Sequence, residues 1–67
     1  MTDNLLFKAL KAKYEYQIVE AEATLAIYFN NSVGIGEHPQ HLEEMDKLVA
    51  QMAEAKDKLE TLKSNFN

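Results

Sequence analysis

The chain of 67 residues lacks cysteine and arginine and contains only one proline and two glycines. Without cysteine there can be no disulfide framework, no thiolate metal site and no thiol nucleophile. Hydrophobic residues nevertheless make up 46% of the chain, and this content, with so few glycines and prolines, is unlike that of a disordered protein. The sequence therefore predicts one small folded domain that comprises residues 1–67.

Positive charge is also scarce, because seven lysines face eleven aspartates and glutamates and leave a net charge of −4. A surface that binds a nucleic-acid duplex needs an excess of basic side chains, so this balance argues against such a partner. The longest uncharged stretch, residues 23–36, has 14 residues and includes polar and turn-forming ones, so it cannot span roughly 30 Å of hydrocarbon. We expect a soluble, cytoplasmic protein with no membrane partner.

Turn-forming residues cluster in the middle of the chain: Asn30, Asn31, Ser32, Gly34 and Gly36, followed by Pro39. Asparagine and glycine tolerate the left-handed conformation that ends helices, and proline suits the first turn of the next helix. No other glycine or proline interrupts the chain. We therefore predict a helix over residues 3–30, a loop over 31–38 and a second helix over 39–64.

The second segment has one apolar face. Its apolar residues recur at alternating steps of three and four: Met45, Leu48, Met52, Ala55, Leu59, Leu62 and Phe66. This spacing is typical of a helix that packs on one side and meets water on the other. On the wet side we expect ion pairs between Glu43 and Lys47 and between Glu54 and Lys58, which follow the order that stabilises a helix.

The first segment has two apolar faces instead of one. The residues that we name the inner face are Phe7, Leu10, Tyr14, Ile18, Ala21, Leu25 and Tyr28. The residues that we name the outer face are Leu5, Ala9, Ala12, Tyr16, Val19, Ala23 and Ile27. At 100° per residue these faces lie on roughly opposite sides of the helix, so a single partner helix cannot cover both.

Each predicted helix is about 40 Å long, whereas a compact chain of this size has a radius of gyration of about 11 Å. We therefore expect an all-α, two-helix antiparallel hairpin that dimerises into a four-helix bundle. The bulky inner face matches the second helix, so we assign it to contacts within the chain. The outer face contains three alanines that allow close approach, so we assign all seven of its residues to the oligomer interface; the opposite assignment would leave the architecture unchanged.

Candidate chemistry is sparse. His38 and His41 form an H-x-x-H spacing, but two imidazoles without a third ligand are a weak metal signal. Glu20 and Glu22 point about 200° apart on a helix and cannot act as a carboxylate pair. We therefore predict no catalytic residue, no metal site and no cofactor.

The middle of the chain carries a more specific pattern. The loop sequence Gly34-Ile35-Gly36-Glu37-His38-Pro39 follows residues 28–31 and leads into residues 43–48. Over about residues 28–62 the chain resembles a family of short uncharacterised proteins of T-even-like phages of marine cyanobacteria. The resemblance implies a virus-encoded protein that works in an infected host cell, and it brings no activity with it. If this block has a function, we expect Ile35, Glu37 and His38 to contact a viral or host protein, since loops often carry recognition.

Two functions remain open from the sequence. The first is a non-enzymatic structural or protein-interaction module that acts as a homo-oligomer. The alternative is a small nucleic-acid-binding regulator that uses the edge formed by Lys8, Lys11 and Lys13, the one basic cluster of the chain.

Overall fold

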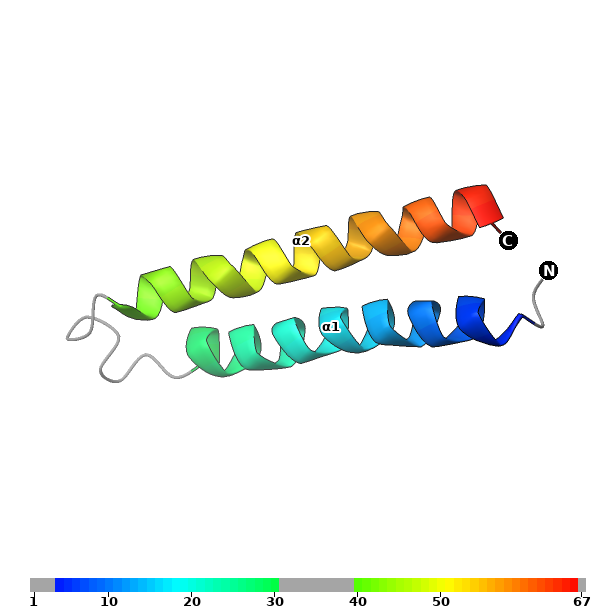
Figure 1. Ribbon diagram of the computed structural model, residues 1–67. Coiled ribbons are helices and arrows are strands. Elements are labelled where there is room, and N and C mark those ends of the chain that lie inside the picture. The colour runs from blue at the N-terminus through cyan, green and yellow to red at the C-terminus, as the bar shows by residue number, and fades with distance from the viewer. Residues whose placement is uncertain (1–3, 31–39, 67) are drawn as a thin grey trace.

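The computed structural model describes residues 4–30 and 40–66, which form two helices. Helix α1 comprises Leu5–Asn30 and helix α2 comprises Gln40–Phe66. The helices run antiparallel, so the beginning of α1 and the end of α2 lie together (Figure 1). The predicted all-α hairpin is confirmed. Its predicted loop, residues 31–38, lies outside the described residues.

The helix bounds follow from local chemistry. Asn4 caps α1, because its side-chain Oδ1 accepts hydrogen bonds from the backbone N–H groups of Leu6 at 2.8 Å and Phe7 at 3.2 Å. These N–H groups have no partner within the helix, and asparagine is among the preferred residues for this position. At the same end of the hairpin, α2 continues to Phe66, two residues beyond the predicted end. The apolar three-four spacing also runs to Phe66, which agrees with this longer helix.

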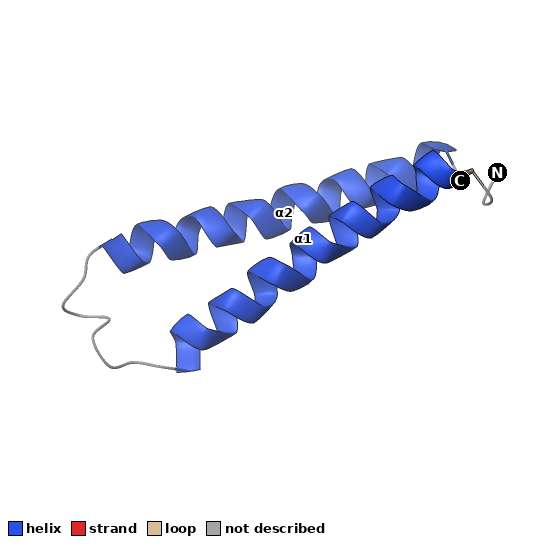
Figure 2. Ribbon diagram, turned by 60° about the horizontal axis from the view of Figure 1, so that its bottom comes forward, coloured by secondary structure: helices blue, strands red, loops and turns tan. Residues whose placement is uncertain are grey.

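The hairpin is a thin rod. Its extents are 50 × 14 × 13 Å and its radius of gyration is 15.3 Å, well above the value of about 11 Å for a compact chain of this length. Figure 2, seen from a second direction, shows that the two helices cross at a shallow angle. Two helices side by side can bury only the strip along which they meet.

The core is correspondingly small. Within the described helices, the buried hydrophobic residues are Ala21 and Leu25 of α1 and Ala55 and Leu62 of α2. Ala21 is 0% exposed and Ala55 is 2% exposed, so these two small side chains lie where the packing is tightest. The other inner-face residues are half-buried, except Leu10, which is 40% exposed. The inner face is therefore the face that contacts α2.

Ion pairs contribute little to holding the two helices together. The ion pairs in the described helices are Lys11–Glu15 at 3.2 Å, Lys47–Glu44 at 3.5 Å and Lys58–Glu54 at 3.8 Å, and each joins residues of one helix. The expected Glu54–Lys58 pair is confirmed. The expected Glu43–Lys47 pair was wrong, because Lys47 contacts Glu44 instead, the carboxylate three positions away. Exposed pairs of this kind contribute about 0–1 kcal/mol each, so burial has to stabilise the hairpin.

The tight packing around Ala21 yields a stability prediction. Ala21→Leu should lower the free energy of unfolding by about 1–3 kcal/mol, because the added carbons have no space between the helices. Ala50→Leu is the matched control, since Ala50 lies on the same rod but is exposed. Urea unfolding at one fixed protein concentration measures both variants. Equal effects of the two substitutions would contradict the packing described here.

Candidate oligomer interface

The outer face of α1 is uncovered along its whole length. All seven of its residues are exposed, and its large members are 78% (Leu5), 62% (Tyr16), 61% (Val19) and 65% (Ile27) exposed. Helix α2 covers the opposite side of α1, so it cannot reach this face as well. These residues therefore lie away from the contact between the two helices, and their role as an oligomer interface stays a prediction.

A chain of hydrogen bonds borders the outer face. The Tyr16 hydroxyl donates to Glu20 Oε2 at 3.1 Å, and the Gln51 side-chain amide of α2 donates to Glu20 Oε1 at 3.0 Å. The same Gln51 nitrogen also donates to the backbone carbonyl of Gln17 at 3.0 Å. Glu20 therefore connects a residue of the outer face to the neighbouring helix, which holds Tyr16 in one orientation.

Gln51 contributes hydrogen bonds between the two helices, and the sequence reasoning did not predict this role. It lies at the edge of the apolar face of α2, between Leu48 and Ala55, where an amide can reach past the packed side chains to the polar atoms of α1. The available signal was a long polar side chain within a run of apolar spacing. The sequence alone does not tell which carbonyl such a side chain would reach.

The Glu20 carboxylate changes the acidity of Tyr16. It raises the pKa of the Tyr16 phenol above the ordinary value of 10.0, first by accepting the hydrogen bond, then by its negative charge, with a smaller desolvation effect. Because the folded state favours the protonated phenol, the contribution to stability is complete below pH 10.0. It is lost as the pH rises through the higher folded pKa.

The lysines of the alternative function are divided between two edges. Lys11 is half-buried and paired with Glu15. Lys8 and Lys13 are exposed, but at 100° per residue they lie about 140° apart around α1. The three lysines therefore do not form a single basic edge.

The histidines do not assemble a metal site in the described part of the chain. His41 lies beside Tyr28, with ring centroids 5.5 Å apart and an interplanar angle of 66°, an edge-to-face contact between the two helices. Across residues 4–30 and 40–66, no three His, Asp or Glu side chains gather closely enough to hold a metal ion. His38, with Ile35 and Glu37 of the proposed partner-binding loop, lies outside the described residues.

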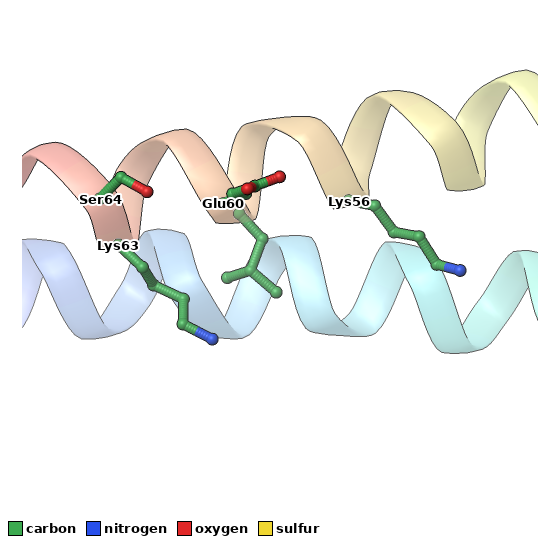
Figure 3. A pocket seen from close by; sticks show the side chains of 5 residues that line it. Lys56, Glu60, Lys63 and Ser64 are labelled. Atoms are coloured by element: carbon green, nitrogen blue, oxygen red, sulfur yellow. The ribbon is translucent and has the colours of Figure 1, made fainter.

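Two of the shallow hollows near the open end of the hairpin differ in their lining. One is lined by Lys56, Leu59, Glu60, Lys63 and Ser64, all from α2, so it is a depression on a single helix (Figure 3). The other is apolar and lies where the helices meet, lined by Leu6, Phe7, Leu10, Leu62 and Phe66 beside the cap Asn4. Sequence reasoning missed this second hollow, because Leu6 belongs to neither apolar face of α1.

Neither described helix contains a segment long and apolar enough to cross a membrane. Comparisons with protein-family models, with curated proteins and with solved structures find no match to the chain. The functional interpretation of this chain therefore rests on the geometry of the hairpin.

The Tyr16–Glu20 contact predicts a shifted titration. The difference in phenolate absorbance between the wild-type protein and Tyr16→Phe isolates the phenol of Tyr16, and its midpoint should lie above pH 10.0. Glu20→Ala removes both the acceptor and the negative charge, so it should return the midpoint to the ordinary range. Circular dichroism confirms that each variant stays helical. A midpoint that does not respond to Glu20→Ala would contradict the contact.

Proposed function

We propose that this protein is a non-enzymatic structural or protein-interaction module that acts as a homo-oligomer, most simply a dimer joined through the outer faces of α1. The observation that carries the proposal is the exposure of the seven outer-face residues along the full length of α1. A row of apolar side chains of this length on a small protein is typical of an interaction surface. Dimerisation would unite two hairpins in a four-helix assembly.

The energies favour association. Full burial of a leucine-sized side chain contributes about 1.5–3 kcal/mol, so four large outer-face residues contribute several kcal/mol per chain. The stability of a small domain is typically only about 5–15 kcal/mol, and the core of this hairpin is small. Association would therefore supply a large part of the stability of the folded chain.

The nucleic-acid alternative has less support. Its three lysines are divided between two edges of α1, Lys11 is paired with Glu15, and the chain as a whole is acidic. The resemblance to the phage family favours a virus-encoded module whose further partner is a viral or host protein, contacted through Ile35, Glu37 and His38. The interaction between copies would then be the scaffold on which this recognition depends.

The proposal predicts a dimer that a single charge can break. Ala12→Glu or Val19→Glu would bury an unpaired carboxylate in the interface, so the dissociation constant should rise by at least about 100-fold. Glu54→Lys is the control, because Glu54 is an exposed residue of α2 outside the interface. Sedimentation equilibrium over a range of concentrations measures the mass of each variant.

A wild-type protein that is folded and monomeric at the highest concentration tested would refute the proposal. Equal masses for all three variants and the wild-type dimer would mean that the copies meet through another surface.

A further inference from the structure

The side-chain sizes on the outer face follow an order that is nearly the same from either end. Tyr16 stands at the centre, Ala9 and Ala23 lie seven residues to either side, and Leu5 and Ile27 lie eleven residues to either side. In a two-fold antiparallel helix pair, residue i contacts residue j and residue j contacts residue i. An antiparallel pair therefore packs well when side chains at equal distances on either side of its centre have similar sizes. A parallel pair does not need this symmetry, because each residue meets its own copy.

The order also fits close packing. In an antiparallel pair centred on Tyr16, the alanines seven residues from the centre meet alanines, and the large end residues meet each other. Ala12, four residues before the centre, and Val19, three residues after it, come close to the same symmetry. Small residues opposite small residues allow the two helices to approach along most of the interface.

The order of the charges along α1 also favours an antiparallel pair. The first half of α1 has three lysines and one carboxylate, Lys8, Lys11, Lys13 and Glu15, whereas Glu20 and Glu22 are the charged residues of its second half. The helix dipole favours the reverse order, with acidic residues near the N-terminus. Helix α2 follows that rule, with Glu43 in its first turn and Lys63 in its last, but α1 has no acidic residue in its first turn and no basic residue in its last. The charge order of α1 is therefore not explained by the stability of α1 itself.

Ion pairs with α2 do not explain it either, because those of the described helices each join residues of one helix, and Glu20 contacts α2 only through the neutral amide of Gln51. The imbalance extends to both described helices. The open half of the hairpin, residues 4–17 and 53–66, has six lysines and four carboxylates, a net charge of +2. Its loop half, residues 18–30 and 40–52, has one lysine and five carboxylates, a net charge of −4. A partner that complements this rod must have the opposite charge order.

A second copy of the chain, placed antiparallel to the first, has this opposite charge order. We propose that two copies pair antiparallel through their outer faces, with Tyr16 next to the two-fold axis. This inference rests on the proposed dimer and adds its direction and register. The open half of each copy then lies beside the loop half of the other, which brings opposite net charges together. A parallel pair would place like charges side by side along the whole rod.

The register also names contacts. On one side of the interface Lys13 lies within one residue, about 1.5 Å along the axis, of Glu20 of the partner subunit, and by symmetry the pair occurs twice. On the other side Lys8 comes within about one turn of Glu22 of the partner subunit. Because the inner and outer faces of α1 are on opposite sides, the four helices lie in one row, with the two α1 helices in the middle and an α2 on each flank.

Cysteine cross-linking tests the direction, since the chain has no cysteine of its own. In the antiparallel register, residues 9 and 23 of different copies are level, whereas two residues 9 are about 21 Å apart along the axis. A short thiol cross-linker should therefore not join Ala9→Cys to itself or Ala23→Cys to itself. It should join an equimolar mixture of the two. Tyr16→Cys is the positional control, because residues 16 meet in either direction.

The outcomes separate the direction from the dimer. Self-cross-linking of Ala9→Cys, without a product from the mixture, would overturn the antiparallel register and leave the dimer standing. A dimeric mass without any product from Tyr16→Cys would overturn the outer-face interface. A monomeric wild-type chain would overturn the proposed function, and the outer face would then need a different protein as its occupant.

A charge reversal gives an independent measurement. Lys13→Glu should weaken the antiparallel dimer roughly tenfold, because it places two carboxylates together at each symmetric contact. The double variant Lys13→Glu with Glu20→Lys should bind more tightly than Glu20→Lys alone, which also lacks the hydrogen bonds of Glu20 to Tyr16 and Gln51. Lys56→Glu, an exposed change of the same charge on α2, should leave affinity within about twofold. An unchanged dissociation constant for Lys13→Glu would overturn the register, because Lys13 would then not lie beside Glu20 of the partner subunit.

Discussion

The structure depends on a single geometric constraint: α1 is apolar on two opposite sides, and one described helix is available to cover them. Helix α2 covers the inner face, where Ala21 and Leu25 are buried. The outer face, with Tyr16 and Val19 exposed, receives no cover from that helix. No rearrangement of two rigid helices changes this, because one helix contacts only one side of another. The hydrophobic effect therefore acts on surface that two helices alone cannot remove from water.

The shape of the rod increases this constraint. A chain of 67 residues spread over a length of 50 Å has little interior. A residue is fully buried only where neighbours pack around it on several sides, and two helices side by side provide few such positions. The buried residues of the described helices include two alanines, which bury little area. Polar contacts between the helices fix how the helices are oriented and add little stability. Gln51 donates hydrogen bonds to Gln17 and Glu20. Nearer the loop, the rings of Tyr28 and His41 meet edge to face. Such contacts fix the relative positions of the helices without replacing a core.

Much of this fold could be predicted from the sequence, because helical spacing directly encodes which residues share a face. The two helices, their separation near residue 30 and the two faces of α1 all follow from positions of apolar side chains. The details that failed depend on atoms rather than on spacing. Lys47 chooses Glu44 over Glu43 through its rotamer, and Gln51 finds a backbone carbonyl that has no signature in the sequence. Leu6 was overlooked because the hollow that it lines exists only once both helices are in place.

The conflict within α1 bears most directly on function. A sequence selected only for a stable helix would place carboxylates near its N-terminus and lysines near its C-terminus, as α2 does with Glu43 and Lys63. Helix α1 has the opposite order and also keeps an apolar face in water, so it departs from two local rules at once. Departures from local consistency are expected where a surface serves something outside the chain. Both are removed by the same event, the approach of a surface that is apolar in the middle and oppositely charged along its length, and a reversed copy of α1 is such a surface.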